Sequence, residues 1–148
     1  MEYITLSNGV KMPQLGYGVY QGTKDECERC VSDALEVGYR AIDTAQSYFN
    51  EEEVGAAIEK SGIDRRDIFL TTKVWVEHYG YEEAKRSVLE SMRKLRTDYL
   101  DLCLLHQPGG FHQQRMSMLT LGQTFLKPEF FAFVFGHLIA FLGQALHP

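Results

Sequence analysis

The sequence predicts a parallel α/β fold, equal to half of a (β/α)8 barrel, with a short hairpin before it and an apolar tail after it. Four segments are expected to form strands: residues 15–19, 39–42, 67–73 and 99–105. They alternate with helical segments in units of roughly thirty residues, the length of a right-handed crossover. The strands lack clean alternation, as expected when both faces of a sheet are covered. A full barrel takes about 250 residues, and this chain has 148.

Composition indicates an ordinary globular chain. Hydrophobic residues make up 45% and charged residues 24%, a balance that argues against disordered and fibrous classes. The net charge of −5 gives no reason to expect nucleic acid, because binding to phosphates relies on clustered Lys and Arg. Neither a basic stretch nor an apolar run follows Met1, so no secretory signal is predicted and we expect a cytoplasmic protein.

Three cysteines, Cys27, Cys30 and Cys103, are too few for a disulfide framework. Cys27 and Cys30 have the spacing of a redox or zinc motif. They fall on the apolar face of a predicted helix, however, and no second ligand pair accompanies them. We therefore expect buried helix residues and no metal site.

The chain begins with a predicted hairpin, in which Asn8-Gly9 separates the apolar runs 3–6 and 10–12. Two glycines lie in the strand that follows, at residues 15–19. Their spacing departs from the G-x-G-x-x-G dinucleotide motif at Gln21, so close backbone approach in a packed barrel explains them better.

Three segments have helical periodicity. Thr23 to Glu26 resembles a capping box and starts a helix that Gly38 ends. Asn50, with Glu53 three residues later, predicts the capped start of a helix from about residue 51 to 60. The third helix spans residues 81–95, with inward positions at Tyr81, Ala84, Val88, Met92 and Leu95.

The character of the chain changes after Pro108. We divide the chain there, into a half-barrel at residues 1–108 and a divergent apolar tail at residues 109–148. From residue 109 onward the only charged residues are Arg115, Lys127 and Glu129. The apolar run 130–142 is shorter than the roughly twenty residues that span a bilayer. A buried or sheet-covering helix is favoured over a membrane-surface role or self-associating chain.

A half-barrel leaves its first and last strands with unpaired backbone groups, which invite pairing with another chain. We hypothesise that the apolar tail covers this opening or that two chains pair as a homodimer to close it.

Ionisable side chains stand at the ends of three predicted strands. Asp43, Lys73 and His106 occupy these positions, and Tyr48 lies in the loop after Asp43. The carboxyl ends of barrel strands face one rim, so the four side chains should converge. Each taken alone is more often structural, but four at corresponding positions predict a site.

These groups form a coherent acid–base set. A phenol with an ordinary pKa of ~10 is a poor acid at neutral pH, and a neighbouring ammonium lowers that pKa. Lys73 would do this for Tyr48, with Asp43 keeping Lys73 charged, while His106 would stabilise negative charge on a carbonyl oxygen. No side chain supplies hydride, so the chemistry implies a nicotinamide cofactor.

Residues 1–108 resemble the N-terminal part of the aldo-keto reductases, in particular the bacterial members similar to 2,5-diketo-gluconate reductases. The matching segments are N-G-V-K-M-P at 8–13, Q-L-G-Y-G-V-Y at 14–20, E-V-G-Y-R-A-I-D-T-A at 36–45, Y-F-N-E-E-E-V-G-A-A-I at 48–58, F-L-T-T-K-V-W at 69–75 and D-Y-L-D-L-C-L-L-H-Q-P at 98–108.

The resemblance implies a (β/α)8 TIM barrel that uses NADPH to reduce small aldehydes and ketones. It implies that Tyr48 is the proton donor, that Lys73 and Asp43 tune it, and that His106 orients the carbonyl. Asp43 is also expected to contact the cofactor. Tyr20 and Trp75 match positions that line an apolar substrate pocket in the family. A role as packed aromatics stays open for both.

Most of the family's cofactor contacts have no counterpart in residues 109–148. The chain is therefore expected to be a truncated or divergent reductase whose own turnover is an open question. The alternatives are a non-catalytic half-barrel that binds a partner through its sheet edges and tail, and a defective product without activity.

Overall fold

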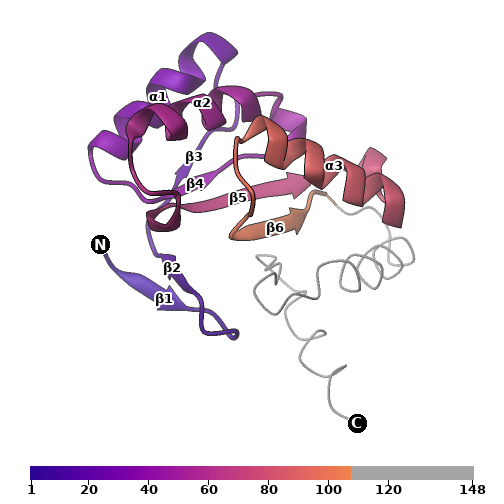
Figure 1. Ribbon diagram of the computed structural model, residues 1–148, viewed down its shortest axis with the longest axis horizontal. Helices are drawn as coiled ribbons and strands as arrows, with labels where there is room; N and C mark the ends of the chain where they lie inside the picture. The colour runs from indigo at the N-terminus through magenta and orange to yellow at the C-terminus, as the bar shows by residue number, and fades with distance from the viewer. Residues whose placement is uncertain (108–148) are drawn as a thin grey trace.

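Three helices cover one face of a four-stranded sheet, and a two-stranded hairpin lies apart from it (Figure 1). The computed structural model describes residues 1–107. The helices are α1 (Lys24–Glu36), α2 (Glu51–Ser61) and α3 (Tyr81–Lys94). The strands are β1 (Tyr3–Thr5), β2 (Lys11–Pro13), β3 (Tyr17–Gly18), β4 (Ala41–Asp43), β5 (Phe69–Val74) and β6 (Leu102–Leu105). The predicted tail and its roles lie outside the described residues.

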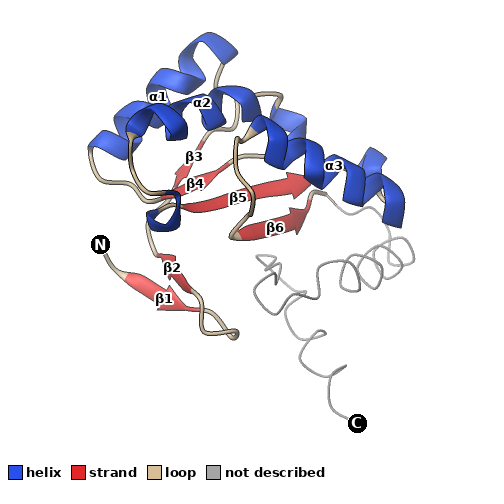
Figure 2. Ribbon diagram, in the orientation of Figure 1, coloured by secondary structure: helices blue, strands red, loops and turns tan. Residues whose placement is uncertain are grey.

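The larger sheet is parallel throughout, in the order β3-β4-β5-β6. Its registers place Tyr17 beside Ile42, Ile42 beside Leu70, and Thr71 beside Leu102. Figure 2 shows the helices on one side of these strands, which is the arrangement of successive β/α units in a barrel. The predicted fold class is therefore confirmed, with the hairpin and the first four barrel strands present.

Two strands begin later than their apolar runs suggest. β5 begins at Phe69 because Arg65–Asp67 forms a 3-10 turn. β6 begins at Leu102, since the chain before it bends around the Arg65 side chain, which donates a 3.0 Å hydrogen bond to the Tyr99 carbonyl. Residues 99–101 have the composition of a strand, but their contact with Arg65 keeps them out of β6.

Both predicted side-chain helix caps are wrong. Thr23 precedes α1, but its hydroxyl donates to the Glu26 carboxylate at 2.7 Å instead of accepting from the backbone. Asn50 precedes α2 and is buried, and its amide donates to the Val19 carbonyl while its oxygen accepts from Thr44. Asn50 therefore ties the start of α2 to the sheet.

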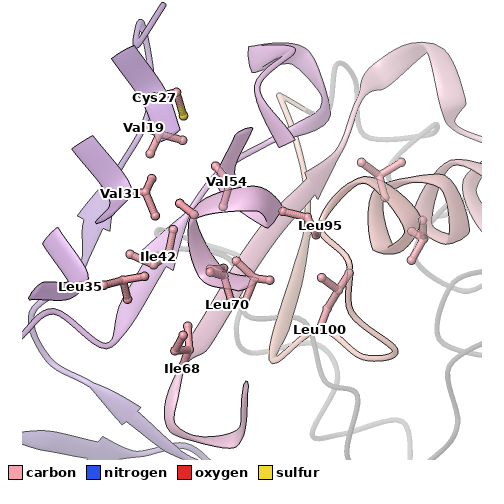
Figure 3. Close-up of a cluster of buried hydrophobic side chains, with 14 of the residues drawn as sticks. Val19, Cys27, Val31, Leu35, Ile42, Val54, Ile68, Leu70, Leu95 and Leu100 are labelled. Carbon is pink, nitrogen blue, oxygen red and sulfur yellow. The ribbon is translucent and has the colours of Figure 1, made fainter. Parts of the chain in front are cut away.

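The core lies between the helices and the sheet (Figure 3). Val31 and Leu35 of α1 and Val54 of α2 point toward Ile42 and Leu70 of the central strands. All five side chains are buried. Val31 and Leu35 are four positions apart, the helical spacing that predicts this packing for α1.

Gly55 allows α2 and α3 to approach closely. A Cβ at this position would lie 2.4 Å from the Lys94 carbonyl oxygen and 2.8 Å from the Leu95 Cα. Any larger residue would push the two helices apart, because both contacts are with backbone. The approach places Glu51 of α2 within hydrogen-bonding distance of Ser91 of α3.

The cysteines have the environments of helix and strand residues. Cys27 lies in the core and Cys30 is half-buried, and neither forms a disulfide. Burial raises the pKa of the Cys27 thiol to about 11, so it stays protonated at neutral pH. Within residues 1–107 no group of three or more His, Cys, Asp or Glu could bind a metal ion. No helix in that range is long and apolar enough to cross a membrane.

Candidate active site

The ends of the parallel strands bring the predicted residues together. Asp43 is the last residue of β4, Lys73 is next to last in β5, and His106 directly follows β6. Strand pairing sets their heights, because Asp43 lies beside Thr71 and Lys73 beside Leu104. The three side chains thus share one rim of the sheet, although they span more than sixty positions of the sequence.

Lys73 and Asp43 form an ion pair beneath this rim. The Lys73 ammonium lies 2.5 Å from Asp43 Oδ1 and donates a second hydrogen bond to the Thr44 carbonyl at 2.9 Å. The lysine side chain is 13% exposed and the aspartate side chain 43%. The ammonium also lies 5.1 Å from the centroid of the Tyr48 ring. Its positive charge is therefore close to the phenol.

Tyr48 closes a short 3-10 turn, Gln46–Tyr48, between β4 and α2. Phe49 follows it with φ at 57°, a left-handed conformation that redirects the chain into α2. The Tyr48 ring lies 5.0 Å from the Tyr20 ring and 5.7 Å from the His106 ring, edge to face with the latter. The phenol thus stands between two other predicted site residues.

His106 is bound through both its backbone and its ring. Its backbone N–H donates to the Val74 carbonyl, and its backbone carbonyl accepts from the Tyr79 hydroxyl, each at 2.9 Å. Its Nδ1 lies 3.0 Å from the Ser47 hydroxyl. Burial lowers the pKa of the imidazole, and the nearby Lys73 charge lowers it further. At neutral pH the ring is accordingly neutral and carries a single N–H.

These side chains border a cavity of about 500 Å³. Tyr20, Tyr48, Trp75 and His106 line it together with three residues that the sequence analysis did not single out: Ser47, Phe49 and Gln107. The Trp75 and His106 rings meet edge to face at 5.4 Å. Asp43 and Lys73 do not line the cavity and lie behind Tyr48.

Half-buried and buried polar side chains fix the loop that carries Tyr48. The Gln46 side chain accepts from the backbone N–H of Trp75 at 2.9 Å and donates to the Ser91 hydroxyl at 3.1 Å. Ser91 and Thr72 both donate to the buried Glu51 carboxylate. Sequence reasoning missed this network, because its members are 21 to 45 positions apart and no local pattern links them.

A family model, described as the aldo/keto reductase family, matches residues 6–126. The chain belongs to the aldo/keto reductase family. The match continues past residue 108, where the sequence analysis placed a domain boundary, and that boundary stays a prediction.

Among the relatives of this reductase-family chain is the morphine 6-dehydrogenase of Pseudomonas putida. It is 50% identical over 105 residues, which are 71% of this chain and 36% of the dehydrogenase. The chain spans less than half the length of the curated relatives it matches.

Solved structures agree with this assignment. One, described as a 2,5-diketo-D-gluconic acid reductase B, is 45% identical with a TM-score of 0.80, over 88% of this chain and 46% of that one. This confirms the predicted resemblance to that group. The Bombyx mori aldo-keto reductase, solved in complex with NADP, is 29% identical with a TM-score of 0.72, over 83% and 47% of the two chains.

Proposed function

We propose that this protein reduces a small aldehyde or ketone to an alcohol with NADPH, using Tyr48 as the proton donor. The observation that supports this most directly is the Lys73–Asp43 ion pair behind Tyr48, 2.5 Å between Nζ and Oδ1, beside a cavity that Tyr48 and His106 share. Carbonyl reduction needs a proton on oxygen as hydride reaches carbon, and this set supplies that proton.

Each side chain has a distinct part in the proposed reaction. The Tyr48 hydroxyl gives its proton to the carbonyl oxygen, and the Lys73 ammonium stabilises the phenolate left behind. Asp43 keeps Lys73 charged and in place. His106 donates a hydrogen bond to the same carbonyl oxygen as negative charge develops on it. Tyr20 and Trp75 provide apolar surface for the substrate.

The described residues suit only the reacting end of NADPH, which supplies the hydride. The cavity lining contains aromatic rings and hydroxyls, whereas no Lys or Arg of residues 1–107 lines it to bind phosphate. We propose that Asp43, whose carboxylate is half-exposed, accepts a hydrogen bond from the cofactor.

Trp75 gives a direct test, because it is the only tryptophan of the chain and lines the cavity. We expect NADPH to quench its emission saturably, and we expect NADPH oxidation when a simple aldehyde is added. Tyr48→Phe should keep the quenching and lose turnover. Oxidation by the variant at the wild-type rate would contradict the proposed role of Tyr48.

A folded chain that shows no quenching at millimolar NADPH would favour the alternative, a non-catalytic half-barrel that binds a partner through its sheet edges. Among residues 1–107 those edges are β3 and β6. Homodimer formation and a cytoplasmic location stay predictions of the sequence.

A further inference from the structure

Ser47 makes a contact that the proposed reaction does not yet use. Its hydroxyl lies 3.0 Å from His106 Nδ1, across 59 positions of the sequence. Both side chains line the cavity, and Ser47 immediately precedes Tyr48 in the same 3-10 turn. The contact therefore joins the turn that carries the proton donor to the end of β6.

The geometry limits how the His106 ring can orient. Its backbone is fixed at both N–H and carbonyl, by Val74 and Tyr79. Trp75 and Tyr48 each lie edge to face with the ring, at 5.4 and 5.7 Å. With the ring held in this way, what remains to be set is which nitrogen carries the proton.

The proton position decides what His106 can do. A carbonyl oxygen only accepts hydrogen bonds, so a ring that binds it must present an N–H to the cavity. With Nδ1 facing Ser47, that N–H must be on Nε2, which leaves Nδ1 as an acceptor. A serine hydroxyl can donate to it. The opposite tautomer would direct the Nε2 lone pair at the carbonyl oxygen and repel it.

We propose that Ser47 is a positioning residue, whose hydroxyl donates to Nδ1 of His106 and thereby keeps the ring in the Nε2–H tautomer that faces the cavity. The catalytic consequence rests on the proposed function. The tautomer itself is a property of the chain without substrate or cofactor, so it can be measured separately.

Ser47 lies in the segment between β4 and α2, the loop that also carries Tyr48. Three side chains of this segment contact distant parts of the chain: Gln46 accepts from the backbone N–H of Trp75, Ser47 contacts His106, and Asn50 donates to the Val19 carbonyl. Of these three side chains, Ser47 is the one that contacts the residue proposed to bind the carbonyl oxygen. Loss of its hydroxyl should therefore change the imidazole more than it changes the fold.

The test uses nitrogen NMR of the 148-residue chain at a pH where the imidazoles are neutral. Among the five histidines, His106→Gln identifies the signals of His106. In the wild type we expect Nδ1 to resonate as an unprotonated nitrogen and Nε2 as a protonated one. In Ser47→Ala the two shifts should move toward each other, because both tautomers become populated. Ser47→Thr, which keeps the hydroxyl, should restore the wild-type pattern.

Ser32→Ala is the matched control. Ser32 is also half-buried, and its substitution removes one hydrogen bond, to the Glu28 carbonyl within α1 and far from the rim. It should leave the His106 signals unchanged. A wild-type ring with the proton on Nδ1, or His106 shifts unchanged in a folded Ser47→Ala chain, would overturn the proposal.

The kinetic arm depends on turnover. We expect kcat/KM to fall roughly 10-fold in Ser47→Ala, the effect of one ordinary hydrogen bond in the transition state. Ser47→Thr should recover most of it, and quenching of Trp75 by NADPH should stay unchanged. A wild-type chain without turnover would contradict the proposed function, while the NMR result would still decide the role of Ser47.

Discussion

Two ion pairs at opposite ends of the sheet have different surroundings. Arg65 and Asp101 lie before β5 and β6, with a 2.8 Å contact, and Lys73 and Asp43 lie at the other end, 2.5 Å apart. The arginine and its aspartate are both about one-fifth exposed, at 18% and 19%. At the other end Lys73 is 13% exposed, whereas Asp43 is 43% exposed. The two pairs therefore differ in how far solvent reaches their carboxylates.

The Arg65 pair has its bonding capacity filled. Besides Asp101, the guanidinium donates to Thr97, to the Ile68 carbonyl, and to the carbonyl and hydroxyl of Tyr99. It also lies 4.1 Å over the Tyr99 ring. Asp101 in turn accepts from the Leu70 N–H at 2.9 Å. This pair fixes the entry into β5 and β6. Every N–H of its guanidinium already has an acceptor, so none is free to bind a ligand.

The Lys73 pair is only partly bonded. Its ammonium has two acceptors in the described residues, Asp43 and the Thr44 carbonyl, for three N–H groups. The remaining charge lies near the ring of Tyr48. This end of the sheet therefore keeps a charge next to the proposed proton donor, and the other end uses its charges to fix the entry into two strands.

Tyrosine-to-phenylalanine variants test the contrast most strongly. Tyr48→Phe should reduce turnover roughly 10²- to 10⁴-fold, because it removes the general acid, and should leave the free energy of unfolding unchanged. Tyr99→Phe is the matched variant at the other end, where it removes a 3.1 Å hydrogen bond to the Arg65 carbonyl. It should cost about 1 kcal/mol of stability and no turnover. Kinetics and urea unfolding of both variants give the answer, and equal stability losses would contradict the contrast.

Arg65→Met should have the next largest effect. It leaves the partly buried Asp101 without its cation, so we expect a loss of about 3 kcal/mol in the free energy of unfolding. Urea denaturation measures this directly. NADPH quenching of Trp75 in the folded variant should match the wild type, because the two sites lie at opposite ends of β5. A stability loss below that of Tyr99→Phe would show that the pair is not structural.

Lys73→Met reverses that result. Stability should fall by less than about 1 kcal/mol, since solvent reaches Asp43 once its partner is gone. Turnover should fall roughly 10²-fold, as expected when a charge that stabilises the transition state is lost. The same two assays decide it. Greater loss of stability than in Arg65→Met would remove the distinction between the two pairs.

Sequence reasoning predicted the parallel sheet and the rim residues because both depend on local features. Apolar runs mark strands, and an ionisable residue at the end of each run marks the rim, so Asp43, Lys73 and His106 could be placed together. Tyr81 was predicted to face inward in α3 but is 39% exposed, since the first turn of the helix extends beyond the core.

Contacts between distant side chains could not be predicted in this way. Asn50 before a helix indicates a cap, and nothing near it shows that its amide reaches the Val19 carbonyl, 31 positions earlier. The same holds for Ser47 and His106. Such partners are set by how the strands and helices stack, which a single sequence does not show.

Glu51 sharpens the comparison as a buried carboxylate with no salt bridge in the described residues. Burial raises its pKa above the ordinary value of 4.5, although hydrogen bonds from Thr72 and Ser91 oppose this. Above pH 4.5 the unfolded chain loses this proton first, so the folded chain binds more protons and stability falls as pH rises through the folded-state pKa. Glu51→Gln cannot titrate and can still bond both hydroxyls.

We therefore expect the stability of Glu51→Gln relative to the wild type to increase as the pH rises above 4.5, by less than the cost of Arg65→Met. Urea unfolding at several pH values measures the difference. Glu90 is an exposed carboxylate whose pKa is lowered by hydrogen bonds from Arg93, so Glu90→Gln should show the opposite trend, and should show it below the ordinary pKa of 4.5. A relative stability of Glu51→Gln that does not change with pH would mean that Glu51 titrates alike in both states. Burial of the Glu51 charge would then cost no stability, although this carboxylate belongs to the network that supports Gln46 and Trp75.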